Sequence, residues 1–140
     1  MRSPEFFANQ SFMRADGSFG RVHDSPAIDG ADMHEYESFS VNNPGVANRF
    51  GRHREQMAAL GKPVMVGEYG VGRKGVTMTP DERAAAAAVK VRAYRQAGAA
   101  ASLYWGVAEP WVTGDNSTNS EAAWERPDGP VVRAIAGALQ

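Results

Sequence analysis

The fold of this chain is constrained most strongly by an alternation between short apolar runs and helical segments. Residues 28–36 suit a strand followed by a polar loop, and the apolar runs at residues 64–66 and 99–107 suit two further strands. Each run is followed by a segment with helical signals, at residues 44–60, 80–96 and 130–139. This order predicts parallel strands joined by crossover helices. Three such units make either a small open α/β sheet or part of a closed barrel, which needs eight units and about 250 residues.

The ends of the helices are marked by capping residues. Before the second helix, Thr79 is placed to act as N-cap, Pro80 opens the first turn and Glu82 completes a capping box. Gly98 follows this helix and Gly61 follows the first one, at positions where glycine commonly ends helices. The Asp and Arg side chains of the second helix are expected on its solvated face.

Composition narrows the class of protein. The chain has 140 residues, of which 43% are hydrophobic and 22% charged, as in a globular domain. We interpret residues 1–140 as one domain with an irregular N-terminal segment, 1–27, and expect His23 and His53 at the surface. A net charge of −1 argues against a nucleic-acid or membrane partner, and the absence of cysteine excludes disulfides and thiolate metal sites. No run suits a signal peptide or a membrane span, and the localisation stays open.

Distinctive side chains stand at the end of each predicted strand. They are His34 and Tyr36 on the first, Glu68 on the second and Trp105 on the third. In parallel α/β proteins, functional groups gather where strands end and the following loops begin. A carboxylate at such a place can attack or stabilise an oxocarbenium-like centre, and an indole offers a flat apolar face to a sugar ring. The combination indicates sugar chemistry.

Regular alternation predicts which of these side chains share a face. Tyr36 falls on the same face as His34, whereas Glu35 points away from it. On the second strand, Val64, Val66 and Glu68 are expected together. On the third strand the corresponding set is Leu103, Trp105 and Val107.

A resemblance to a known family rests on three of these segments. Residues 62–70, KPVMVGEYG, are very similar to the signature of glycoside hydrolase family 5, the cellulase and β-mannanase family of clan A. His34-Glu35-Tyr36 resembles the family's H-x-Y motif, and Tyr104-Trp105 resembles its last-strand tryptophan motif. The resemblance covers residues 28 to about 112, with the motifs in the family's order and at the spacing of successive βα units.

The resemblance implies a fold, a reaction and a set of roles. The fold is a partial (β/α)₈ TIM barrel comprising about the last three βα units, the sixth to the eighth. The reaction is retaining hydrolysis of β-1,4-linked glycans of the cellulose or mannan type, with no cofactor and no metal. Glu68 is then the nucleophile, Tyr36 its hydrogen-bond partner, His34 a contact to substrate and Trp105 the stacking platform. The substrate is an oligo- or polysaccharide, and the parent enzyme is expected to be secreted.

The chain also departs from the family pattern. The family's acid/base glutamate follows an asparagine, and no Asn-Glu pair occurs in this sequence. Retaining hydrolysis needs two carboxyl groups about 5–5.5 Å apart, so we expect this chain to carry the nucleophile without the acid/base. The simplest interpretation is a fragment or truncated product that does not hydrolyse glycans alone. The alternative is a noncatalytic half-barrel that only binds carbohydrate or self-associates through exposed strand edges.

Plainer interpretations of individual residues stay open. His34, Tyr36 and Trp105 can be ordinary half-buried or core side chains. Asp32, His34 and Glu68 can be imagined as a metal site, although their spacing does not require one. Further candidates for sugar contact in the loop after the third strand are Glu109, Trp111 and Trp124, which local packing would explain equally well.

Overall fold

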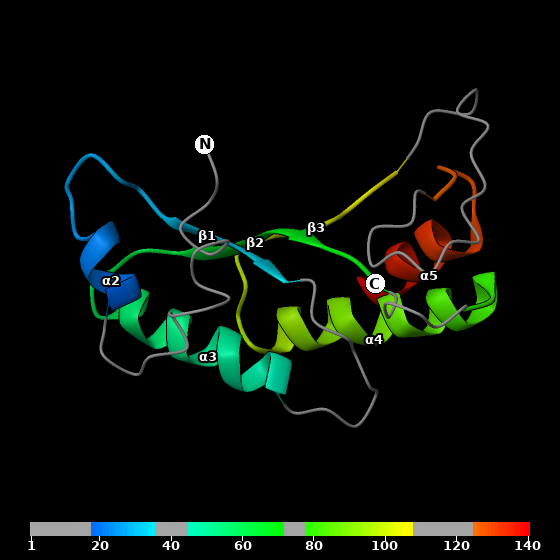
Figure 1. The fold of residues 1–140 in the computed structure, drawn as a ribbon, viewed down its shortest axis with the longest axis horizontal. Helices are drawn as coiled ribbons and strands as arrows, with labels where there is room; N and C mark the ends of the chain where they lie inside the picture. Colours follow the sequence, from blue (N-terminus) through cyan, green and yellow to red (C-terminus); the bar gives the residue numbers. More distant parts are fainter. Residues whose placement is uncertain (1–17, 36–44, 72–77, 108–124) are drawn as a thin grey trace.

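A computed structural model describes residues 18–35, 45–71, 78–107 and 125–140. In chain order its elements are α2 (Ser18–His23), β1 (Ala31–Glu35), α3 (Gly45–Ala58), β2 (Val64–Tyr69), α4 (Pro80–Gln96), β3 (Ser102–Tyr104) and α5 (Pro130–Ala138) (Figure 1). The predicted alternation of strands and helices is confirmed. One difference is α2, a short helix inside the stretch that the sequence predicts to be irregular.

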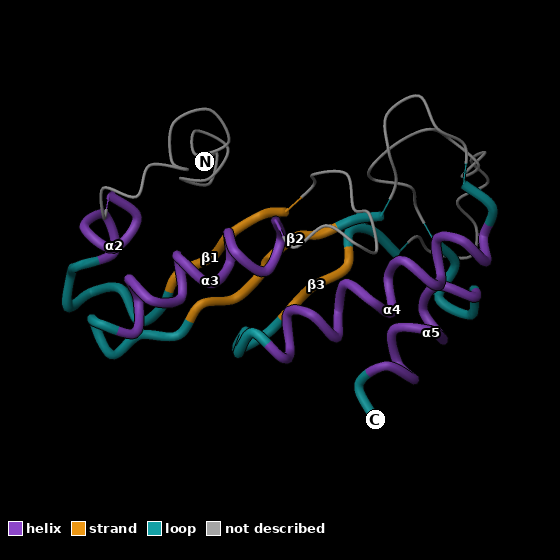
Figure 2. Tube along the Cα trace, turned by 90° about the horizontal axis from the view of Figure 1, so that it is seen from below, coloured by secondary structure: helices purple, strands orange, loops and turns teal. Residues whose placement is uncertain are grey.

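The three strands form one parallel sheet in the order β1-β2-β3, so β2 lies in the centre. Helices α3 and α4 run along one face of this sheet, and α5 packs beside α4 (Figures 1 and 2). Within the described residues no helix covers the opposite face, which we call the open face. The chain is therefore an α/β assembly of consecutive parallel units, as the sequence predicts.

The core lies between the sheet and its helices. Met33, Val66 and Tyr69 point from the strands into this layer and are fully buried. Phe50 and Tyr94 meet them from α3 and α4, and the ring of Tyr94 packs edge-on against that of Tyr69, with centroids 5.3 Å apart. Burying each side chain of this size stabilises the fold by roughly 1.5–3 kcal/mol. This face holds the units together.

Helix α4 begins as predicted. Thr79 accepts a hydrogen bond from the Glu82 backbone, and the Glu82 carboxylate accepts one in return from the Thr79 backbone, which forms the capping box. Gly98 after α4 and Gly61 after α3 both adopt positive φ, at 83° and 68°. Left-handed backbone of this kind favours glycine, which is why the chain can turn sharply out of both helices.

Several polar side chains are buried where the sequence predicts a surface. Arg83 of α4 is buried, and its Nε lies 2.6 Å from Glu125 Oε1. His23 and His53 are also buried, and the ring of His53 stacks on that of Phe19 at 4.0 Å. The surface predictions for these residues are wrong. Arg83 is buried because α4 packs against both the sheet and α5, so that only a narrow face of this helix is solvated.

None of the helices in the described ranges combines the length and the apolar character needed to cross a membrane.

Candidate functional site

The strand β2 carries one extra residue at the point where the candidate site begins. Opposite β1, Val66 pairs with Met33 and Glu68 pairs with His34, so Gly67 has no partner in the ladder. The register with β3 shifts over the same stretch. Gly67 is thus a β-bulge, which changes the direction in which the following side chains point.

The bulge corrects the prediction that Glu68 shares a face with Val64 and Val66. Those two valines are buried on the helix side, whereas Glu68 is partly exposed on the open face and Tyr69 takes the next buried position. Regular alternation fails here because the extra residue at 67 reverses the sides that follow. The result brings Glu68 to the face occupied by His34.

His34 and Glu68 form the centre of the site. His34 Nδ1 lies 3.2 Å from Glu68 Oε2, and both side chains are a little under one-third exposed. Glu35, the residue after His34, is fully buried on the opposite face, as predicted. The site therefore contains a solvent-accessible carboxylate held beside an imidazole at the carboxyl ends of two neighbouring strands.

Asp32 occupies the other side of the His34 ring. Its Oδ2 lies 3.3 Å from His34 Nε2, and its Oδ1 accepts a hydrogen bond of 2.7 Å from the Gly67 backbone. Both ring nitrogens consequently face carboxylates. An ionised carboxylate can accept hydrogen bonds but cannot donate one. A neutral imidazole has one N–H, so it can donate to Asp32 or to Glu68 but not to both. The sequence signal for Asp32 is its position two residues before His34, on the same face of the strand.

Trp105 stands at the end of the third strand. Its backbone N–H donates to the Tyr69 carbonyl at 2.7 Å, which fixes it beside the end of β2. Trp105 is 41% exposed, and the neighbouring residues Leu103 and Val107 are 53% and 44% exposed. The peptide bond between Trp105 and Gly106 is cis. Of these three residues only Leu103 lies in β3, so the face predicted to be shared by Leu103, Trp105 and Val107 stays a prediction.

Lys90 ties the ends of the first two strands to α4. This lysine is fully buried, and its Nζ donates to the carbonyl oxygens of Glu35 at 3.1 Å and Gly70 at 3.0 Å. These carbonyls belong to the residue after His34 and to the second residue after Glu68. The backbone beyond both candidate side chains is thus anchored from the helix layer.

The tyrosine next to Glu68 is separate from the site. Tyr69 lies in the core, and burial raises the pKa of its hydroxyl above the ordinary value of 10.0, so this phenol stays neutral. Tyr36, the tyrosine predicted to contact Glu68, lies outside the described residues, as do Glu109, Trp111 and Trp124. The contact between Tyr36 and Glu68 stays a prediction.

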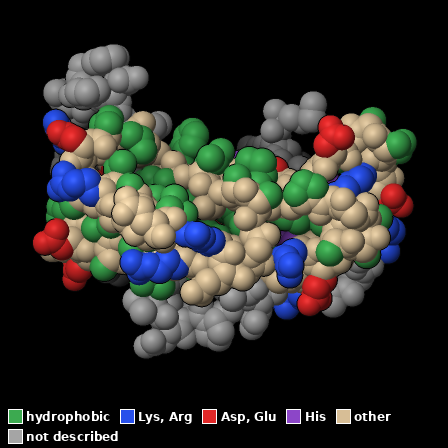
Figure 3. Space-filling model, turned by 180° about the vertical axis from the view of Figure 1, so that it is seen from behind, with side chains coloured by type: hydrophobic (Ala, Val, Ile, Leu, Met, Phe, Trp, Pro, Cys, Tyr) green, Lys and Arg blue, Asp and Glu red, His purple; other side chains and the backbone are tan. Residues whose placement is uncertain are grey.

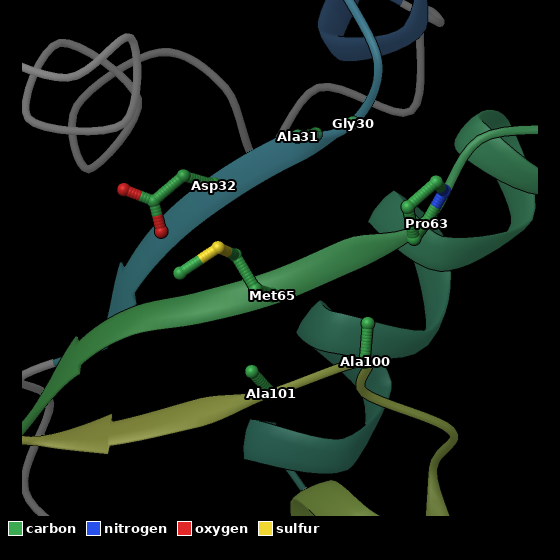
Figure 4. A pocket seen from close by; sticks show the side chains of 7 residues that line it. All are labelled: Gly30, Ala31, Asp32, Pro63, Met65, Ala100 and Ala101. Carbon is green, nitrogen blue, oxygen red and sulfur yellow. The ribbon is translucent and has the colours of Figure 1, made fainter.

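A cavity of about 290 Å³ opens at the other end of the sheet (Figure 4). It is lined by Gly30, Ala31, Asp32, Pro63, Met65, Ala100 and Ala101. Figure 4 shows the side chains of Asp32 and Met65 standing on the same side of the strands. The lining is made of small and apolar residues apart from Asp32, so the cavity adds no second reactive group to the site.

The metal alternative gains no support from the geometry. Within the described ranges, no three His, Asp or Glu side chains are arranged to hold a metal ion. Asp32, His34 and Glu68 instead contact one another in a row, with the imidazole between the two carboxylates.

These features define a class of fold: consecutive βα units of a parallel barrel with polar groups at the carboxyl ends of the strands. Solved structures similar to the chain include three endo-β-1,4-mannanases. One from Thermotoga petrophila superposes with a TM-score of 0.62 and 16% identity, covering 86% of this chain and 27% of that one. The hyperthermostable mannanase of T. petrophila RKU-1, with maltose and glycerol, superposes with a TM-score of 0.60 and 16% identity, covering 86% of this chain and 36% of that one. The mannanase of Rhizomucor miehei superposes with a TM-score of 0.60 and 17% identity, covering 86% of this chain and 33% of that one.

The comparison shows the fold of the chain and how much of each mannanase the chain corresponds to. At 16–17% identity the likeness concerns the fold, and the chain spans about 27–36% of the length of the mannanases it matches. This agrees with the predicted α/β fold of a partial (β/α)₈ barrel. No protein-family profile matches the sequence, and no curated protein matches it.

Proposed function

We propose that the open face carries the nucleophile half of a retaining β-glycosidase site, with Glu68 as the nucleophile. The observation that carries this proposal is the bulge at Gly67. It turns Glu68 out of the core and places its carboxylate 3.2 Å from His34, at the carboxyl end of the central strand. A bulge that re-aims one side chain is a feature commonly found beside active sites.

The proposed reaction follows from the chemistry of a partly exposed carboxylate. A Glu68 oxygen attacks the anomeric carbon, a C–O bond to Glu68 forms, and the glycosidic C–O bond breaks. The leaving oxygen takes a proton from an acid, and water later hydrolyses the glycosyl ester. His34 contacts a substrate hydroxyl, Tyr36 donates to the nucleophile, and Trp105 stacks against the sugar ring.

The proposed substrate is a β-1,4-linked glycan of the mannan or glucan type. The names of the three similar structures favour mannan within this class. Among the residues that the structure describes, none beside Glu68 offers a second carboxyl for the acid/base role, since Asp32 is engaged by His34 and by the Gly67 amide. We therefore assign the acid to another part of the parent barrel.

A trapping experiment tests Glu68 directly. A 2-deoxy-2-fluoro-β-mannoside with a dinitrophenolate leaving group needs no acid, because the phenolate departs unprotonated. We expect one sugar to become attached to the peptide that contains Glu68, as read by intact mass and peptide mapping. The variant Glu68→Gln should remain unlabelled, whereas Glu55→Gln, at an exposed position of α3, should label normally. Labelling of a different carboxylate in the wild-type chain would contradict the assignment.

A second candidate function is favoured by the uncovered sheet. Leu103 of β3 and the residues Trp105 and Val107 that follow it are exposed, and Figure 3 shows hydrophobic side chains gathered along the hollowed upper side of the molecule. Such a surface fits a half-barrel that associates without catalysis. Size exclusion with light scattering should show associated chains, and Leu103→Glu should shift them toward the monomer. Association together with no trapping at Glu68 would favour this second function.

A further inference from the structure

We propose that Asp32 is a positioning residue that fixes both the bulge and the His34 ring, and through them the direction of Glu68. The inference deepens the proposed function and rests on the assignment of Glu68 as nucleophile. It concerns a residue that has no part in the motifs of the family resemblance.

The first step concerns the backbone of the bulge. An extra residue in a strand has no partner in the ladder, so its N–H needs another acceptor. Gly67 N–H donates to Asp32 Oδ1 at 2.7 Å. A hydrogen bond to an ionised carboxylate is about twice as strong as one between neutral groups. Asp32 therefore supplies the acceptor that the bulge requires.

The second step concerns the fit between the two residues. A Cβ built on Gly67 would overlap the carboxylate of Asp32. Glycine at position 67 allows the carboxylate to approach the backbone closely, and the carboxylate in turn satisfies the amide. The two residues lie on neighbouring strands and depend on each other, so a change in either one disturbs the same contact.

The third step links this contact to the reactive group. The second oxygen of Asp32 lies 3.3 Å from His34 Nε2, and His34 Nδ1 lies 3.2 Å from Glu68 Oε2. Since Glu68 directly follows Gly67, the contacts close a ring that runs from the bulge through two side chains to the nucleophile. Misplacing a reacting group by about 1 Å can lower a rate by about 100-fold. Asp32 acts on Glu68 through this ring and does not itself touch substrate.

Three variants separate the parts of the proposal. Asp32→Asn keeps an oxygen that can accept from Gly67 N–H but removes the charge beside His34. Asp32→Ala removes both. Asp29→Ala is the matched control, because Asp29 is an exposed aspartate three residues earlier. A fourth variant, Gly67→Ala, leaves Asp32 in place and disturbs the contact from the other strand.

The first readout is hydrogen exchange of the Gly67 amide, measured by mass spectrometry with residue-level fragmentation. We expect exchange to be about tenfold faster in Asp32→Ala and about threefold faster in Asp32→Asn, since the amide oxygen of Asn still accepts the hydrogen bond but more weakly than the carboxylate does. Asp29→Ala should not differ from wild type. Peptides of α4 report whether each variant is folded, and Asp32→Asn keeps the test decisive if Asp32→Ala unfolds.

The second readout is carbethoxylation of histidines, followed by peptide mapping at one fixed pH. The reagent must reach a ring nitrogen, and Asp32 Oδ2 stands 3.3 Å from His34 Nε2, so loss of Asp32 should open access to this nitrogen and increase modification of His34 several-fold. The buried residues His23 and His53 serve as internal references that should not change. Unchanged Gly67 exchange and unchanged His34 modification in Asp32→Ala would overturn the positioning role.

The third readout connects positioning to reactivity. Trapping of Glu68 by the fluorinated mannoside should slow by about 10–100-fold in Asp32→Ala and in Gly67→Ala, and less in Asp32→Asn. The two proposals can fail separately. If wild-type Glu68 is not trapped, the nucleophile assignment fails, while hydrogen exchange and carbethoxylation still decide the role of Asp32. If Glu68 is trapped equally fast in every variant, Asp32 does not position it.

Discussion

The two faces of the same three strands differ in almost every physical property. On the helix side, Met33, Val66 and Tyr69 are fully buried and pack against aromatic rings of α3 and α4. On the open side, Asp32 and Glu68 keep part of their surface in water. The strands thus serve two purposes at once: one face supplies stability and the other supplies the candidate chemistry.

The open face differs from the helix side because apolar residues there remain uncovered within the described part of the chain. Leu103 of the parallel strand β3 is 53% exposed, and Trp105 and Val107, just beyond the strand, are 41% and 44% exposed. Parallel sheets are normally covered on both faces. The similar mannanases, of which this chain spans about 27–36%, have much more chain with which to cover such a face.

The largest expected effect concerns hydrolysis and tests whether the open face suffices for catalysis. The purified chain should show no turnover of β-mannan or β-glucan above background, measured by release of reducing sugar. General acid–base assistance alone is worth about 10²–10⁴-fold. Among the described residues, the carboxylate of Asp32 is already engaged by His34 and by the Gly67 amide. Robust turnover that disappears in Glu68→Ala would mean that a carboxylate of this chain acts as the acid.

The next prediction tests whether stability resides in the covered face. Tyr69→Ala should lower the free energy of unfolding by about 3–5 kcal/mol, because it leaves a cavity in the core. Leu103→Ala, on the open face, should change it by less than about 0.5 kcal/mol. Urea unfolding followed by circular dichroism, at one fixed chain concentration, measures both. Similar losses for the two variants would show that the open face is also packed.

A smaller effect is expected at the link between the helix layer and the site. Lys90→Met should lower the free energy of unfolding by about 1–3 kcal/mol, since the carbonyls of Glu35 and Gly70 lose a buried donor. Arg92→Met, at an exposed position of the same helix, is the control and should be close to neutral. Trapping at Glu68 should also slow in Lys90→Met, because the backbone beyond His34 and Glu68 loses its anchor to α4.

The smallest effect concerns the start of α4. It tests whether a loss of stability on the helix side leaves the contacts of the open face unchanged. Thr79→Ala should lower the free energy of unfolding by about 1 kcal/mol, the usual contribution of an N-cap, without changing Gly67 exchange. Hydrogen bonds from the Thr79 backbone and hydroxyl lower the pKa of Glu82 below its ordinary value of 4.5. The stability that Glu82 adds is therefore present above pH 4.5 and is lost as the pH falls through the lowered pKa. Glu82→Gln should weaken this acid dependence of the unfolding midpoint.

Local signals predicted the fold well. The capping box at Thr79, the glycines at positions 61 and 98, and the apolar run 64–66 each depend on a few neighbouring residues, and all agree with the structure. The third strand is shorter than predicted, at Ser102–Tyr104 within the apolar run 99–107. Apolar composition marks a buried or sheet-facing stretch but does not tell where the ladder of hydrogen bonds ends.

Contacts between distant segments limited the prediction of the site. His34 and Glu68 could be placed at neighbouring strand ends from the motifs alone, but the face of Glu68 could not, because nothing local distinguishes a bulged Gly67 from a regular one. The sequence suggests Asp32 only as a metal ligand, since its partner is a backbone amide 35 residues away. The helical pattern predicts a solvated Arg83 for the same reason, because its partner Glu125 lies in a different segment.

The extra residue in β2 makes the number of residues in this strand as important as their identity. Removing one residue before position 68 would exchange the sides of Glu68 and Tyr69, sending the carboxylate into the core and the phenol into water. Every amino acid except one would still be present, yet the face would have lost its reactive group. In any set of aligned sequences, a one-residue gap at this point would therefore be as informative about the chemistry as a substitution of the glutamate itself.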